Sequence, residues 1–172
     1  MPEQQKTDIE RAGEDLFNYA IDREDVKYLL AHLPPEATVK RGTVEYELQI
    51  LKIIGVGWNI TYCLAHQPVY KKALSELYWH AVQQFAASLS ETTGLMIGQD
   101  VDYFDILKDR LDTYVAALAD QPDSGEAAQV IGNRFAGLCG YKDDIFAFMS
   151  GSKMFLSVTR RVSRYLEALS IS

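Results

Sequence analysis

The chain has 172 residues, 48% apolar and 24% charged, a size and composition that suit one soluble globular domain with a single core. Its net charge of −7 opposes binding to phosphate backbones and to anionic membrane surfaces, so neither nucleic acid nor membrane is expected as a partner. No apolar run reaches the roughly 18 residues of a membrane span, and the charged N-terminus contains no apolar signal segment. Two cysteines are too few for a disulfide framework, which favours free thiols and a cytoplasmic location.

The first third of the chain carries start and stop signals for three helices. Residues 7–10, Thr-Asp-Ile-Glu, match a capping box, in which the threonine and glutamate side chains accept free backbone amides of the first turn. Asp22 can cap a second, short helix that ends at the two prolines at 34–35, because proline has no amide to donate and disfavours helix in the residue before it. Thr43 can cap a third helix over about residues 43–66.

The segment 43–66 is apolar around most of a helical circumference. Such a helix has to be enclosed by other elements, so we predict that it is the central helix of the fold. If it is fully buried, Lys52 and Asn59 need a protein partner, a water molecule or a ligand, whereas on an exposed helix they are ordinary surface residues. The mostly polar row of this helix, with two glycines beside it, supplies the first candidates for ligand binding: Lys52, Gly55, Gly57 and Asn59.

A long amphipathic helix is predicted next. Pro68 is well placed at its start, and the apolar stripe continues over about residues 69–93 until Gly94, which is expected to end the helix. Residues 94–99 then form a loop. Three apolar residues of this loop are expected to tuck onto the core: Leu95, Met96 and Ile97.

The last third of the chain predicts two or three further helices. Asp100 can cap an amphipathic helix whose outer face carries a row of aspartates. The sequence Gln-Pro-Asp-Ser-Gly at 121–125 is typical of a linker or hinge. A helix up to Gly140 follows, then a short apolar segment that breaks at 150–152, and a final helix over about residues 152–169.

No segment alternates apolar and polar residues as a strand does, and no repeat is present. The chain is therefore predicted to be all-α. We expect a single domain over residues 1–172, built as a bundle of six to seven helices around the apolar helix at about 43–66.

Catalytic and metal-binding patterns are weak. Cys63 and His66 are three residues apart, and Glu76 and His80 are four apart, but a structural zinc site needs about four ligands and no second close pair accompanies Cys63 and His66. Neither Cys63 nor Cys139 lies in a motif that would lower a thiol pKa, and the Gly-x-Ser-x-Gly motif of serine hydrolases is absent. We predict no catalytic residue and no cofactor. A metal- or thiol-dependent enzyme around Cys63, His66 and His80 remains an alternative.

Small residues recur every four positions near the end of the chain. Ala128, Gly132, Ala136 and Gly140 place a ridge of minimal side chains on one helix face, which lets another backbone approach closely. Packing against Gly55 and Gly57 of the central helix is one interpretation. The other is a slot for a small apolar ligand or cofactor, which adds Gly132 and Ala136 to the ligand-binding candidates.

Positive charge gathers at the C-terminal end. From residue 151 onward four cations stand against Glu167 alone, a local charge of +3 that leaves −10 for the rest of the chain. These cations are Lys153, Arg160, Arg161 and Arg164. They form either a docking surface for an acidic protein or a phosphate-bearing ligand, or, more simply, pair with the aspartate-rich face of residues 100–112 or remain solvated.

Aromatic residues suggest a second contact surface. Tyr70, Tyr78 and Trp79 spread around one helix, beyond what a single inward stripe needs, and such residues are enriched at protein interfaces. We therefore predict that the helix at 69–93 contributes to a homodimer contact. The function predicted from the sequence is binding without catalysis, to another protein or to a copy of the chain itself. The alternatives are the apolar-ligand slot and the Cys63 enzyme.

Overall fold

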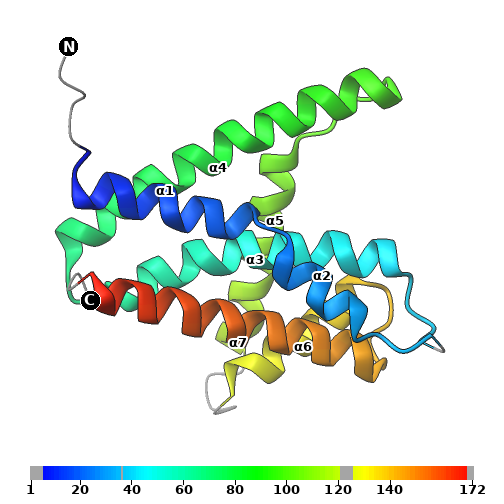
Figure 1. Ribbon diagram of the computed structural model, residues 1–172. Helices are drawn as coiled ribbons and strands as arrows, with labels where there is room; N and C mark the ends of the chain where they lie inside the picture. Colours follow the sequence, from blue (N-terminus) through cyan, green and yellow to red (C-terminus); the bar gives the residue numbers. More distant parts are fainter. Residues whose placement is uncertain (1–5, 36, 121–125, 170–172) are drawn as a thin grey trace.

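The computed structural model describes residues 6–35, 37–120 and 126–169, and in these the chain forms helices and no strand (Figure 1). The linker predicted at 121–125 lies outside the described residues. The all-α class and the expected number of helices are confirmed for the described residues. The helices are α1 (Asp8–Ile21), α2 (Glu24–Ala31), α3 (Arg41–Cys63), α4 (Pro68–Ile97), α5 (Tyr103–Asp120), α6 (Ala127–Leu138) and α7 (Ile145–Ala168).

Helix α3 is the centre of the fold, as its apolar circumference predicts. It packs against α1, α2, α4, α5 and α7, and Figure 1 shows it running through the middle of the bundle. Every residue from 50 to 57 is buried, a run of more than two turns, so no face of this part of the helix reaches solvent. Leu48 and Ile60 are among its fully buried side chains, and each contributes roughly 1.5 to 3 kcal/mol relative to exposure.

The predicted capping box of α1 is confirmed, and the predicted start of α3 is changed. In the capping box of α1, the Glu10 amide donates to Thr7 Oγ1 at 3.3 Å and the Thr7 amide donates to Glu10 Oε2 at 2.7 Å. Helix α3 begins at Arg41, two residues before the predicted cap. Helix α7 begins directly after its N-cap residue Asp144, whose carboxylate accepts hydrogen bonds from the backbone amides of Phe146 and Ala147.

Helix α7 continues through the predicted break at 150–152. The hydroxyls of both serines there form hydrogen bonds that leave the helix continuous. Ser150 donates to the Phe146 carbonyl at 2.8 Å, and Ser152 donates to the Ala128 carbonyl of α6 at 2.9 Å. A serine in the middle of a helix can donate its hydroxyl to a carbonyl in this way without ending the helix. The short apolar segment and the final helix are therefore one helix.

Helix α4 is longer than predicted. It continues through Gly94 to Ile97 and ends at Gly98, which has a left-handed φ of 67° and donates its amide to the Gly94 carbonyl at 2.9 Å. A residue without a side chain adopts this conformation without strain, so the second glycine ends the helix instead of the first. The prediction that the three apolar residues between these glycines pack onto the core is wrong. Leu95, Met96 and Ile97 are 83%, 80% and 55% exposed.

The small-residue ridge of α6 packs against α7 and not against the glycines of α3. A Cβ added to Gly132 would lie 2.7 Å from the Phe148 carbonyl oxygen, and one added to Gly151 of α7 would lie 2.6 Å from the Phe135 Cβ of α6. Each helix thus supplies a glycine where the other presses closest. Gly55 faces Val158 of α7 instead. The inference that another backbone approaches this ridge closely is correct, but the approaching helix is α7 and not α3.

We expect opposite effects from two alanine substitutions in α6. Gly132→Ala forces a methyl group into the α6–α7 contact, and we expect it to lower the free energy of unfolding by about 1 to 3 kcal/mol. Gly137→Ala meets no atom within 4 Å, and it should be neutral or stabilising by up to about 1 kcal/mol because alanine restricts the unfolded chain. Urea denaturation followed by circular dichroism measures both. Equal losses at the two positions would contradict this account of the ridge.

Candidate functional site

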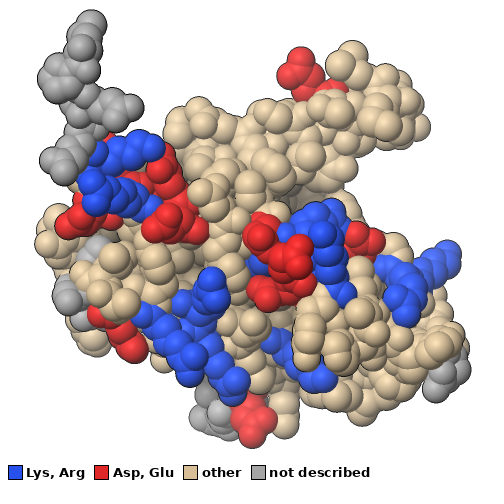
Figure 2. All heavy atoms as spheres, viewed as in Figure 1, with Lys and Arg blue, Asp and Glu red and all other residues tan. Residues whose placement is uncertain are grey.

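An open groove of about 720 Å³ lies between α7 and the α1–α2 corner. We call it the basic groove. On this face Lys and Arg side chains gather over α7, as Figure 2 shows. Its lining combines four cations with two tyrosines: Tyr19, Asp25, Lys153, Leu156, Ser157, Arg160, Arg161, Arg164 and Tyr165. The structure thus brings the predicted arginine candidates together with residues of α1 and α2 that the sequence did not connect to them.

The helical repeat of α7 aligns the cations. Met154, Val158, Val162 and Leu166 form its buried row, which fixes the rotation of the helix against the core. The groove-lining cations lie beside that row: Lys153 is on one turn, and Arg160, Arg161 and Arg164 lie together about two to three turns further along the helix. Eleven residues of helix rise by about 16 Å, so the positive charges form an elongated stripe and not a compact cluster.

The four cations have no ion-pair partner within the described part of the chain. Of the two simpler interpretations from sequence, pairing with the aspartates of α5 is wrong for the described residues, whereas exposure of the cations to solvent agrees with the structure. Asp105 pairs with Lys108 of its own helix at 2.7 Å, and Asp109 pairs with Arg110 at 2.9 Å. The positive charge of the groove therefore faces solvent.

Two carboxylates border the groove, and both are engaged. The Tyr165 hydroxyl donates to Asp15 Oδ2 at 2.6 Å, which raises the pKa of Tyr165, with burial as the larger cause. Asp25 Oδ2 lies 3.3 Å from the ammonium nitrogen of Lys52. These contacts leave the stripe on α7 with a net positive field.

Lys52 lies behind the groove and is fully buried. Its Nζ donates to the Asp22 carbonyl at 2.7 Å and lies 4.4 Å from the centre of the Tyr19 ring. The Arg161 guanidinium lies 5.4 Å from the centre of the same ring, so both cations contact its π system. Burial lowers the pKa of Lys52, and the Asp25 carboxylate acts in the opposite direction. Lys52 thereby fixes Tyr19 and the α1–α2 corner beside α7.

The other candidates on α3 are used in packing. Asn59 is buried and donates its amide to the Gly55 carbonyl at 2.8 Å. Gly57 accommodates the Trp79 ring of α4. The cavity beside Gly55 measures about 20 Å³, room for about one water molecule. Ala136 is fully buried between helices, so the described residues leave no space for an apolar ligand beside these glycines.

The thiols and histidines do not assemble into a metal site among the described residues. The described residues include no group of three or more His, Cys, Asp or Glu side chains that could hold a metal ion, and this applies to Cys63, His66 and His80. Burial raises the pKa of Cys63, and it raises the pKa of Cys139 to about 12. Both thiols are therefore held in the protonated, unreactive form at neutral pH.

The aromatic candidates on α4 separate into buried and exposed residues. Tyr78 is fully buried and donates its hydroxyl to the Ile53 carbonyl at 2.6 Å, so it is not available to a partner. Trp79 packs edge-on against Tyr78 and over Gly57. Tyr70 is 43% exposed and remains a candidate for an interface.

One buried ion pair has no counterpart in the sequence predictions. Glu47 of α3 is 3% exposed and accepts two hydrogen bonds from the Arg110 guanidinium of α5, at 2.8 and 3.0 Å. A signal was present, because Glu47 precedes the buried Ile50, Leu51 and Ile54 by three, four and seven residues and so shares their helix face. An acidic residue on such a face requires a cationic partner.

The chain matches no protein-family model, no curated protein and no solved structure. Among the described helices, none combines the length and the apolar character needed to cross a membrane.

The Lys52→Met substitution tests how this residue supports the groove. Methionine retains an apolar stem, but the Asp22 carbonyl and the Asp25 carboxylate lose a charged donor. We expect the free energy of unfolding to fall by about 1 to 3 kcal/mol at neutral pH, measured by urea denaturation.

The loss should increase as the pH is raised from neutral toward 10.5, the ordinary lysine value. Between the lowered pKa of the folded Lys52 and that ordinary value, the folded wild type has released the Lys52 proton while the unfolded chain still binds it, so the wild type gains stability that the variant lacks. A loss that shrinks with rising pH would contradict the lowered pKa.

Proposed function

We propose that the chain is a non-catalytic protein-binding domain that holds an acidic segment of a partner protein in the basic groove. The observation that carries the proposal is the stripe of four solvent-facing cations on α7, without ion-pair partners in the described residues, in a chain whose net charge is −7. Basic side chains usually alternate with acidic ones on a helix surface that only serves solubility.

The shape of the groove favours a peptide segment over a single phosphate group. A stripe of about 16 Å matches about five residues of extended chain. A phosphate group would engage one or two of the four cations. Tyr19, Leu156 and Tyr165 lie among the cations and offer the aromatic and apolar contacts that protein interfaces use between charged positions.

Charge attraction would orient the acidic segment in the basic groove more than it would raise the binding affinity. The remainder of the chain carries −10 and as a whole repels an acidic segment, so the stripe on α7 favours binding in the groove. Exposed charge pairs each contribute less than about 1 kcal/mol and are screened by salt. The expected complex is consequently weak, fast to form and sensitive to ionic strength.

Fluorescence anisotropy with a labelled peptide of about ten glutamates tests the proposal. We expect binding at low salt that weakens at least tenfold in the Arg160→Glu/Arg164→Glu variant, because the peptide then meets like charge in the groove. The matched control is Lys71→Glu/Lys72→Glu on α4, which changes the net charge equally outside the groove.

Equal losses in the two double variants would show that net charge alone governs binding and would overturn the proposal. So would a wild-type protein that binds inorganic phosphate at the arginines but not the peptide, since the groove would then be a phosphate site.

A further inference from the structure

The C-terminal end of α4 displays an uncovered apolar surface. Leu95, Met96 and Ile97, which we call the α4 tip, are exposed by 83%, 80% and 55%, and they follow one another in the sequence. Figure 1 shows this end of α4 projecting beyond the helices packed around α3. Single exposed apolar residues are common, but a contiguous group marks a contact surface.

Hydrogen bonds hold the α4 tip in its projecting position. The Tyr103 amide donates to Ser90 Oγ at 3.0 Å, and the Thr93 hydroxyl donates to the Tyr103 hydroxyl at 3.4 Å, which joins the start of α5 to the last turns of α4. Gly98 closes the final turn with its bond to Gly94. The tip is therefore preorganised, so a partner that covers it has little ordering cost to offset.

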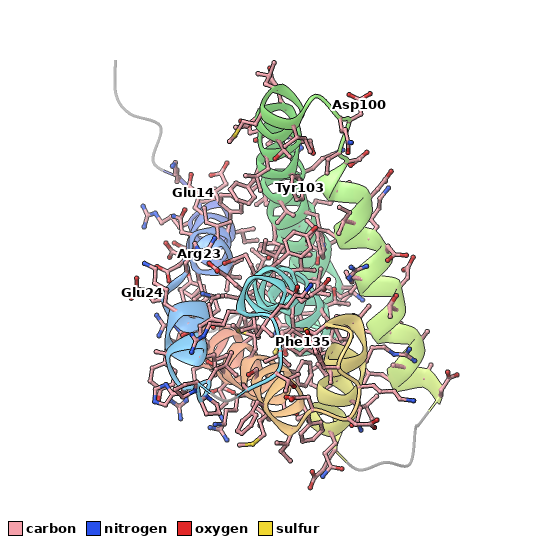
Figure 3. All side chains as sticks on the ribbon, turned by 90° about the vertical axis from the view of Figure 1, so that its right-hand side faces the viewer. Glu14, Arg23, Glu24, Asp100, Tyr103 and Phe135 are labelled. Atoms are coloured by element: carbon pink, nitrogen blue, oxygen red, sulfur yellow. The ribbon has the colours of Figure 1, made fainter. Side chains whose placement is uncertain are left out.

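An apolar groove of about 380 Å³ lies between α1, α3, α4 and α5, and we call it the apolar groove. Ile50 and Ile53 of α3, Phe85 and Leu89 of α4, and Ile106 and Leu107 of α5 form most of its apolar surface. Figure 3 looks onto this side of the molecule and labels Arg23 and Tyr103, which also line the groove. Arg23 pairs with Glu45 there, so the groove lining carries no unbalanced charge.

We propose that the α4 tip of one chain docks in the apolar groove of a second copy, so that the chain forms a two-fold dimer. Each chain carries both surfaces of this contact, the exposed α4 tip and the apolar groove. Its own tip cannot fill its own groove, because α4 is one continuous helix and Met96 lies about 10 Å beyond Leu89 along the axis. A two-fold axis beside the last turns of α4 places each tip over the groove of the other copy, and every contact is then made twice.

The charge pattern of α4 permits this approach. Residues 92–99 contain no charged side chain, although 24% of the whole chain is charged. The tip therefore brings no charge into the apolar groove, where the charged lining residues Arg23 and Glu45 pair with each other. A small apolar ligand in the groove is the competing occupant, but it would leave the α4 tip uncovered. The contact is small compared with a standard protein interface, so the dimer is expected to be weak and concentration-dependent.

Sedimentation velocity over a range from about 1 to about 200 μM, which brackets the dissociation constant of a weak dimer, measures the association. We expect the wild type to shift from monomer to dimer, and we expect Met96→Glu in the tip and Leu89→Glu in the groove each to weaken association at least tenfold. Both side chains are exposed enough, at 80% and 39%, for the fold to tolerate the change. Val69→Glu, on the same helix and 77% exposed, is the matched control and should leave association unchanged.

Mixing the two variants distinguishes reciprocal docking from a general loss of solubility or folding. The Met96→Glu chain retains an intact groove and the Leu89→Glu chain retains an intact tip. The mixture should form heterodimers through one of the two contacts, more tightly than either variant associates with itself.

A strictly monomeric wild type would overturn the proposal, as would a mixture that associates no better than its components or an equal effect of Val69→Glu. Native mass spectrometry of the wild type supplies the remaining outcome. A monomer carrying a small apolar molecule that Leu89→Glu loses would assign the groove to a ligand and reject the dimer.

Discussion

The enclosure of the middle of α3 on all sides is the constraint from which the rest of this structure follows. A helix without a solvent-facing side has to satisfy its polar side chains from neighbouring elements. Glu47 is satisfied by Arg110 of α5 and Lys52 by the α1–α2 corner, whereas Asn59 donates its side-chain amide within α3, to the Gly55 carbonyl, and its Oδ1 has no partner among the described residues. Removing either member of a buried ion pair is costly, so the first two contacts select the rotation of α3 relative to its neighbours.

These contacts also determine where the two grooves form. Lys52 attaches Asp22, Asp25 and Tyr19 to α3, and the α1–α2 corner thereby becomes one wall of the basic groove beside α7. Lys52 is thus a structural residue whose charge is used inside the protein. The sequence-based interpretation, in which it was a ligand-binding candidate, correctly identified an unusual residue, and the structure relates it to the arginines through the Tyr19 ring.

Helix α4 follows α3 closely over only part of its length. Leu74, Tyr78, Val82 and Ala86 are its buried residues, and none lies after position 86. The Tyr78 hydroxyl and the Trp79 ring attach the first half to α3, which removes those two aromatic residues from the interface that their abundance suggested. The second half diverges, leaves the apolar groove beside it and ends in the α4 tip. The indication of self-association on this helix thus moves from its aromatic residues to its C-terminal end.

Local chemistry in the sequence determined the start of α1 and the apolar faces, because a capping box or a 3.6-residue repeat acts within a few residues. Helix α3 could be recognised as central from its composition alone, and the cations of α7 from their spacing. The tertiary structure alone decided which partners those residues meet. Whether Arg160 finds an aspartate of α5, whether Gly132 faces α3 or α7, and whether Gly94 or Gly98 ends α4 depend on the positions of distant helices. Those positions are set by the packing of the whole core, which no single stretch of sequence encodes.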